Sequence, residues 1–286
     1  FFLGNFDHLQ VNIVIFALAL GGLFLAARGR PLAGGLLLGT AAALKAMPVA
    51  FLPYLLYRRR WTFAGAATTT FLALFFLAPV LAYGPERAAD YFATWWAGTH
   101  ADFGSAKMNQ SVYAMFDRYL AHGVTPFHAE PTSVLSFSRE PLVGVATLAL
   151  LAVVGIASLL AFRGPAHPAS PAALAEYGAV FIVSSFFGPL TWKAYLVVLL
   201  LPCALVTRLV LERRTRPSVR RAALAALGAL LFTSLDTPGL VGSRLSGSLA
   251  MLSDCTLAGL LLLGVLLWLL GRRALSSGEV TTFHRK

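Results

Sequence analysis

Residues 142–162 read LVGVATLALLAVVGIASLLAF and contain no charged side chain. A helix needs about 20 predominantly apolar residues to cross the hydrocarbon core of a bilayer, so this stretch predicts a membrane-spanning helix. It ends at Arg163, a residue that suits the polar surface of a membrane. Apolar runs of similar character recur before and after it, and short polar turns separate them.

The composition of the chain agrees with a membrane protein. Of its 286 residues, 58% are hydrophobic and 12% are charged, whereas soluble domains carry about 25% charged residues. We therefore expect an all-α fold, a polytopic transmembrane helical bundle. It would form one multi-pass membrane domain at residues 1–273, followed by a cytoplasmic tail at 274–286. The expected spans are residues 11–27, 32–57 (broken), 62–83, 142–162, 174–190, 194–206, 222–235 and 249–270.

The basic residues assign a side to each turn. Most of the 23 Lys and Arg residues lie in short runs at one set of span ends, such as 58–60, 213–221 and 272–273. Loops rich in Lys and Arg stay in the cytoplasm. The long polar interval at 84–140 falls on the opposite side, so we expect an extracytoplasmic loop that is partly helical.

The formal net charge of +11 does not indicate nucleic acid as a partner. The basic residues lie in turns between apolar segments, whereas a nucleic-acid interface interleaves them with stacking aromatics on one face. The expected partner is the lipid bilayer.

The segment at residues 32–57 poses a conflict. Both of its ends are cytoplasmic by charge, yet it is too short for two full spans. Two half-length helices that meet near Lys45-Ala46-Met47-Pro48 would resolve the conflict, because broken helices are tolerated where they line a protein cavity. Lys45 lies in an apolar run, where a cation costs roughly 3 kcal/mol unless it faces a cavity or a partner. Its ammonium is a candidate phosphate ligand, and snorkelling to the membrane surface is the alternative.

A cluster of polar side chains opens the first span. Asp7, His8, Gln10 and Asn12 combine a carboxylate, an imidazole and two amides. Sugar hydroxyls need both donors and acceptors, and this set supplies them. The alternative is a polar helix start with Asp7 as its N-cap.

A second polar cluster lies in the long extracytoplasmic interval. Asn109 and Gln110, followed by Arg118, suggest a loop that folds over a site and binds substrate. Asn109-Gln110-Ser111 also matches the N-glycosylation sequon, a pattern with many chance matches. Residues 236–248 form a further polar stretch that should face the same side.

Trp192 and Lys193 occupy the extracytoplasmic turn between two expected spans. Lys193 could stabilise a leaving phosphate electrostatically, or it could contact lipid headgroups. Trp95-Trp96 also has two interpretations, an interfacial aromatic belt or a stacking platform for a sugar ring. Gly35 and Gly39 fit a close helix-packing motif.

Several of these motifs, in their order along the chain, resemble one enzyme family. Leu9-Gln10-Val11-Asn12 opens a span, and a short Arg-rich turn follows. The later motifs are Lys45-Ala46-Met47-Pro48, Tyr54-Leu55-Leu56-Tyr57-Arg58-Arg59-Arg60-Trp61, Asn109-Gln110-Ser111-Val112 and Gly188-Pro189-Leu190-Thr191-Trp192-Lys193. This order resembles glycosyltransferase family 87, polytopic enzymes of the GT-C type best known as polyprenol-phosphate-mannose-dependent mannosyltransferases.

The resemblance implies inverting transfer of a hexose, usually mannose, from a polyprenol-phosphate-sugar donor to a lipid or glycan acceptor. A carboxylate would act as general base on the acceptor hydroxyl, and the transition state would resemble an oxocarbenium ion. Lys45, Arg118 and Lys193 would hold the departing phosphate. The implied setting is the bacterial cytoplasmic (inner) membrane, with an extracytoplasmic active site. The chain has no Asp-x-Asp pair, so we expect no metal and no other cofactor.

The chain departs from the family at three places. Leu9 stands where the family commonly has Gly, and Lys193-Ala194 follows a Trp after which the family often has histidines. The family's catalytic Asp lies in the first extracytoplasmic loop, a region expected to precede Phe1. We therefore expect an N-terminally truncated fragment whose catalytic base is unassigned; Asp7 is a candidate but does not simply inherit the role.

Two other classes of protein remain open. A transporter or flippase of a lipid-linked or anionic substrate would use Lys45 and the broken helix as a midplane binding site. A non-catalytic assembly subunit is the third hypothesis. An enzyme should gather polar residues with a carboxylate at the outer membrane face, whereas a transporter should place paired charges near the midplane.

Overall fold

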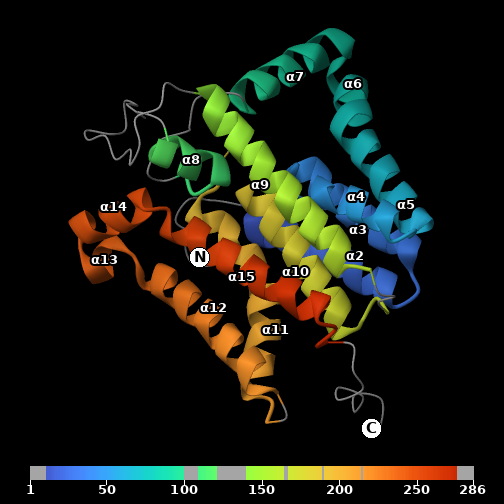
Figure 1. Cartoon of the computed structure of the whole chain (residues 1–286). Coiled ribbons are helices and arrows are strands. Elements are labelled where there is room, and N and C mark those ends of the chain that lie inside the picture. The colour runs from blue at the N-terminus through green and yellow to red at the C-terminus, as the bar shows by residue number, and fades with distance from the viewer. Residues whose placement is uncertain are drawn as a thin grey trace. The chain divides into compact units, whose positions relative to one another are not determined.

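The computed structural model describes residues 11–99, 109–120, 140–163, 167–188, 190–213 and 215–275. Within these ranges every regular element is a helix and no strand occurs (Figure 1). The all-α prediction is therefore confirmed. Five of the described helices are long and apolar enough to cross a membrane, namely Trp61–Tyr83, Pro141–Ala161, Lys193–Leu211, Pro217–Leu235 and Asp254–Gly271.

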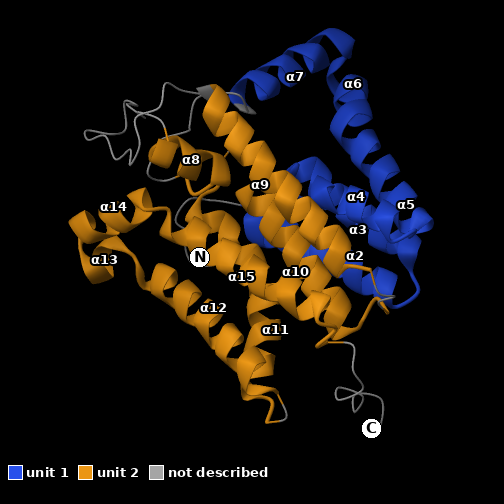
Figure 2. Ribbon diagram, in the orientation of Figure 1, with its two compact units in different colours: residues 1–103 blue, residues 104–286 orange. Residues whose placement is uncertain are grey.

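The chain divides into two compact units, residues 1–103 and residues 104–286 (Figure 2). The boundary falls inside the polar interval at 84–140. The described helices of the first unit are α2 (Asn12–Ala27), α3 (Pro31–Leu44), η1 (Met47–Ala50), α4 (Phe51–Tyr57), α5 (Trp61–Leu72), η2 (Ala73–Leu77), α6 (Ala78–Tyr83) and α7 (Pro85–Thr99).

Glycines bring α2, α3 and α5 into close contact. A Cβ atom added to Gly22 of α2 would lie 2.7 Å from the carbonyl oxygen of Gly34 in α3, and one added to Gly39 would lie 2.5 Å from that of Ala67 in α5. A Cβ on Gly35 would collide with Ala66. Small residues that let backbones approach are a common way to pack helices in a membrane. The packing role predicted for Gly35 and Gly39 is therefore confirmed.

The segment at 32–57 is broken where the sequence predicts a break. Helix α3 ends at Leu44, and Lys45 has extended backbone angles of φ −155° and ψ 124°. The 3-10 turn η1 then contains Pro48, which cannot donate a backbone hydrogen bond, and α4 follows directly. The two half-length helices are thus joined by an irregular stretch that begins at Lys45.

A second irregularity lies in the long helix Trp61–Tyr83. Its middle part, η2, is a π-helical segment of 5 residues, and Pro79 follows it in the first turn of α6. Proline lacks the N–H that would bond the carbonyl of Phe75, and its ring crowds that carbonyl. The wider π turn accommodates both effects. Gly84, at φ +83°, then ends the helix and leads into α7.

The described helices of the second unit are α8 (Val112–Leu120), α9 (Glu140–Ala161), α10 (Pro171–Phe186), η3 (Lys193–Leu199), α11 (Leu200–Leu211), α12 (Pro217–Leu235), α13 (Pro238–Val241), α14 (Ser243–Met251) and α15 (Asp254–Gly271). Helix α15 packs against α10 and α12, and α11 packs against α12 (Figure 1). The phenyl ring of Phe186 at the end of α10 lies where a side chain on Gly259 of α15 would have to be. The core of this unit therefore forms around α10 and α15.

The last expected span, 249–270, differs from the observed helix. Residues 249–251 belong to the short helix α14, and α15 begins only at Asp254. Between them Ser253 takes the left-handed conformation with φ 57° and ψ 39°, which is uncommon for a residue other than glycine. The expected span joins them because Leu249, Ala250 and Met251 at the end of α14 are apolar and lead into the apolar run of α15 in the sequence.

Basic residues mark one end of the spans in the second unit. The five-residue turn at 212–216 joins Lys193–Leu211 to Pro217–Leu235 and contains arginines. The span Asp254–Gly271 is followed by Arg272 and Arg273. Because α11 packs on α12 and α12 on α15, these basic ends lie on one side of the unit.

Candidate functional site

Three of the residues predicted to bind substrate, Asp7, His8 and Gln10, lie outside the described part of the chain. Asn12, the fourth member of that cluster, is the first residue of α2 and is fully buried. The described candidate residues are Asn12 and Lys45 in the first unit and, separately, Asn109, Gln110, Arg118, Trp192 and Lys193 in the second unit.

Asn12 and Lys45 are brought together within the first unit. The Nζ atom of Lys45 donates a hydrogen bond of 2.6 Å to the Oδ1 atom of Asn12. Lys45 can reach this oxygen because its backbone leaves the helical path at the end of α3. The buried amide oxygen gives the ammonium a polar partner, which lowers the cost of a cation there.

Asn109 holds the turn that precedes Lys193. It is fully buried, and its Oδ1 atom accepts hydrogen bonds from the backbone N–H groups of Ser111, at 3.0 Å, and Thr191, at 2.9 Å. The hydroxyl oxygen of Ser111 accepts from the N–H of Ala114 at 3.1 Å and so caps α8. In this conformation Asn109 has no surface with which to contact a substrate.

Gln110 connects three segments of the second unit. Its backbone N–H donates to the carbonyl of Thr191 at 2.6 Å, and its Nε2 atom donates to the carbonyl of Ala250 at 2.9 Å. Its own carbonyl accepts from the hydroxyl of Thr256 at 2.8 Å. Gln110 is also fully buried, so the segment at 109–111 fixes the Thr191 turn to the junction of α14 and α15.

Arg118 is buried, with 2% of its surface exposed. Its Nη2 and Nε atoms donate to the hydroxyl oxygen of Ser253 at 2.6 and 3.2 Å, and its Nη1 atom donates to the carbonyl of Asn109 at 2.9 Å. Burial lowers the pKa of Arg118 to about 10, although the charges of Tyr119, Asp117 and Asp254 oppose this effect. The guanidinium therefore stays cationic at neutral pH, and it holds Ser253 in its left-handed conformation.

Lys193 differs from these buried residues because its side chain is 32% exposed. Its Nζ atom donates to the Oδ2 atom of Asp236 at 2.9 Å and to the backbone carbonyl of Asp236 at 2.6 Å. The Asp236 side chain is 1% exposed. An ammonium has three N–H donors, so the third has no partner among the described residues and is available to a ligand.

Asp254 is a second buried carboxylate near this ion pair. It begins α15, and the charges of Lys193 and Asp236 act on its carboxyl group. The Oδ1 atoms of both Asp236 and Asp254 are buried and have no hydrogen-bond partner in the described part of the chain. Neither carboxylate stands out in the sequence as a candidate site residue, although Asp236 begins a polar stretch that is expected to face the same side as Lys193.

Lys193, Asp236 and Asp254 share one position relative to the spans. Lys193 begins its span, Asp236 follows directly on Pro217–Leu235, and Asp254 begins the last span. Each of these ends is opposite to a basic end. The three side chains therefore lie at one face of the second unit. Trp192, directly before Lys193, is half-buried.

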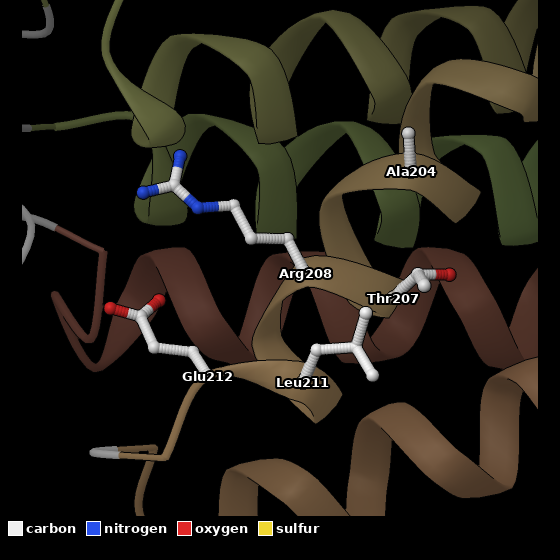
Figure 3. Close-up of a pocket in the computed structure, with 5 residues that line it drawn as sticks. All are labelled: Ala204, Thr207, Arg208, Leu211 and Glu212. Atoms are coloured by element: carbon white, nitrogen blue, oxygen red, sulfur yellow. The ribbon is translucent and has the colours of Figure 1, made fainter. Parts of the chain in front are cut away.

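The described surface has a hollow elsewhere, at the basic end of α11. It encloses about 600 Å³ and is lined by Ala204, Thr207, Arg208, Leu211 and Glu212. The charged groups of Arg208 and Glu212 extend to the same side of α11, and the Thr207 hydroxyl points away from them (Figure 3). Lys193 lies at the opposite end of the same span, so this hollow is not part of the Lys193 site.

Comparison with known proteins yields one match. The model of a protein family described as glycosyltransferase family 87 matches residues 1–189. No curated protein and no solved structure matches the chain.

Proposed function

The chain belongs to glycosyltransferase family 87, and we propose that it transfers a hexose, mannose in the first instance, from a polyprenol-phosphate-sugar donor. The acceptor is a lipid or a glycan. The reaction takes place at the extracytoplasmic face of a multi-pass protein in the bacterial cytoplasmic membrane.

The observation that carries this proposal is the geometry of Lys193. Its ammonium is partly exposed, is held by Asp236 and keeps one N–H donor free of described partners. It lies at the end of the spans opposite to the basic turns, and the positive-inside rule supports an extracytoplasmic position for that end. A cation fixed at this position suits the phosphate of a donor whose lipid tail lies in the membrane.

The proposed step requires a cation at the phosphate. The acceptor hydroxyl oxygen attacks C1 of the sugar while a general base takes its proton, and the bond from C1 to the phosphate oxygen breaks with its electron pair on that oxygen. The phosphate thus gains one negative charge over the step, and part of this charge has already developed in the transition state. Lys193 would stabilise this charge, and Lys45 is a second candidate cation. The base is not assigned to a described residue, and Asp7 remains a candidate.

Asn109, Gln110 and Arg118 take a different role in this proposal from the one expected from sequence. All three are buried and engaged with other parts of the second unit. We assign them to holding the Thr191 turn and the start of α15, which carry Lys193 and Asp254. Their effect on transfer would be indirect.

The transporter hypothesis predicts a different position for the charged residues. A midplane site would place its paired charges in the middle of a span. The ion pair between Lys193 and Asp236 lies at span ends instead, which favours the enzyme. The break at Lys45 suits either class of protein.

A transfer assay tests the proposal. Membranes that contain the protein would be incubated with radiolabelled polyprenol-phosphate-mannose, and transfer to endogenous acceptors would be followed. We expect transfer by the wild type and a loss of about 100-fold in kcat/KM for Lys193→Ala, because removing one group that stabilises the transition state costs this much. Lys193→Arg should retain part of the activity. Arg244→Ala, which removes an exposed cation from α14, should leave transfer within about twofold of wild type.

The outcomes separate the hypotheses. Transfer that does not depend on Lys193 would remove the role of this residue but not the enzyme. Absence of transfer from the mannosyl donor would direct the assay to other polyprenol-phosphate sugars. If none of them supports transfer by intact protein, the enzyme proposal is wrong and the transporter hypothesis takes its place.

A further inference from the structure

Asp236 contacts Lys193 at two of the three ammonium donors, one through its carboxylate and one through its backbone carbonyl. The carboxylate itself is almost fully buried, with 1% of the side chain exposed. A donor phosphate therefore cannot reach Asp236, whereas it can reach the exposed part of Lys193. Asp236 can influence the reaction only through the ammonium that it holds.

The need for such a partner follows from the chemistry of lysine. Its ammonium is a point charge on a flexible four-carbon stem, and fixing a long side chain costs up to about 2 kcal/mol of rotamer entropy. Two hydrogen bonds to a buried residue fix the ammonium before the donor arrives. Misplacing a group by about 1 Å can lower a rate by about 100-fold.

We propose that Asp236 is a positioning residue that fixes the Lys193 ammonium so that its third N–H meets the donor phosphate as charge develops on it. This inference rests on the proposed function, because it assumes a phosphate at Lys193. Asp254 is a second carboxyl group near this pair. Its side chain is buried as well, so it does not contact the donor.

This role predicts a distinct kinetic signature. Removal of the Asp236 carboxylate has two opposite effects on donor binding. It removes a negative charge that repels the phosphate, and it leaves the Lys193 ammonium less ordered, so the two effects on donor affinity offset each other. The donor KM of Asp236→Ala should therefore stay near that of wild type, while kcat falls about tenfold because the ammonium is displaced in the transition state. Asp236→Glu, which keeps the carboxylate, should recover part of kcat.

A double-mutant cycle distinguishes positioning from a general structural role. Because Asp236 acts through Lys193, the double variant Lys193→Ala, Asp236→Ala should be no less active than Lys193→Ala alone. A further loss of activity in the double variant would overturn the inference, and so would wild-type kcat in Asp236→Ala. Asp236→Asn, which keeps the size of the side chain, serves in the same cycle if Asp236→Ala does not fold.

A second readout does not depend on activity. An amine-selective reagent would be added to membranes that contain wild type or Asp236→Asn, and modification of Lys193 would be measured by peptide mass spectrometry with Lys45 as the internal reference. We expect Lys193 to react several-fold faster in Asp236→Asn, because the carboxylate no longer holds it. Equal reaction rates would show that Asp236 does not fix the ammonium, even if the wild type transfers no sugar and the proposed function itself fails.

Discussion

Single residues decide how each described lysine is held. Lys45 donates to the amide oxygen of Asn12, whereas Lys193 donates to a carboxylate and a carbonyl of the same residue, Asp236. A hydrogen bond in which the donor or the acceptor is charged is roughly twice as strong as one between neutral groups, so the ammonium of each lysine makes strong bonds, and the two differ in the charge of the partner. Lys193 is thus bound to a charged partner that is itself buried, and its exposed side remains directed outward.

The buried amide of Asn109 leads to the first prediction. Asn109→Ala removes the acceptor of two backbone N–H groups, those of Ser111 and Thr191. Each buried donor left without a partner costs about 1–3 kcal/mol, so the variant should unfold at a clearly lower temperature in detergent or nanodiscs. Asn109→Asp keeps an oxygen acceptor and should lose less. A variant of wild-type stability with a raised donor KM would instead indicate that Asn109 contacts the substrate.

The sequence predicts some of these residues and not others for a physical reason. Lys45 and Lys193 stand out because a cation near an apolar run is costly. The pairing of each lysine with its partner does not show in the sequence, because Asn12 precedes Lys45 by 33 positions and Asp236 follows Lys193 by 43. Asn109 and Arg118 are visible as polar residues, but only the fold shows that their polar atoms face backbone groups and the Ser253 hydroxyl rather than a cavity.

Whole helices depend on the small residues at their contacts, which gives a second prediction. Gly39→Leu would force a side chain against the backbone of α5, where even a Cβ atom would lie 2.5 Å from the carbonyl oxygen of Ala67. Overpacking of this kind typically costs about 1–3 kcal/mol, so the thermal unfolding midpoint of the protein in nanodiscs should fall. Gly65→Leu is the matched control, because nothing lies within 4 Å of a Cβ at that position. Equal midpoints for the two variants would contradict the close contact of α3 and α5.

Helix α7 carries the third prediction. It follows a span directly after Gly84, and Trp96 is 62% exposed while Trp95 packs edge-on against Phe75 with ring centroids 5.3 Å apart. Tryptophans at a span end favour the lipid headgroup level. In a variant that keeps Trp96 as its only tryptophan, brominated lipids should quench fluorescence more strongly when the bromine lies near the headgroups than near the chain ends. Absence of quenching, combined with an emission change on adding the donor, would favour a sugar-stacking platform instead.

Apolar runs predict most of the helices, but not where neighbouring helices divide. The expected span 62–83 corresponds to Trp61–Tyr83, and 142–162 to α9. By contrast, the separation of α14 from α15 depends on Ser253, whose left-handed backbone is held by Arg118. That hydrogen bond joins residues 135 positions apart, which no local pattern can reveal.

At the scale of the whole molecule, charge and helix order together determine which ends of the spans share a side. In the second unit the basic turn at 212–216 and the pair Arg272–Arg273 mark one side, and the Lys193 and Asp236 ion pair lies at the other. The sequence predicts, through the positive-inside rule, both the side on which the basic residues lie and the opposite side for Lys193 and Asp236. What the sequence could not supply is the contact itself, which depends on how α11 and α12 pack.

The orientation of helix α12 provides the last prediction and decides on which face of the membrane the proposed transfer occurs. Ser218 lies in the first turn of α12, beside the basic turn, and Ser243 lies beyond the other end, past Asp236; both are exposed. In a background where Cys203 and Cys255 are replaced by alanine, a membrane-impermeant thiol reagent added to intact cells should label Ser243→Cys and not Ser218→Cys. After permeabilisation both should be labelled, because serine-to-cysteine changes at exposed positions leave the fold nearly unaltered. The reverse pattern would place Lys193 and Asp236 on the cytoplasmic face. The basic turns predict the extracytoplasmic face for this pair. An extracytoplasmic donor site could not then be formed by this pair, and the phosphate-binding role of Lys193 would have to be abandoned together with the membrane face.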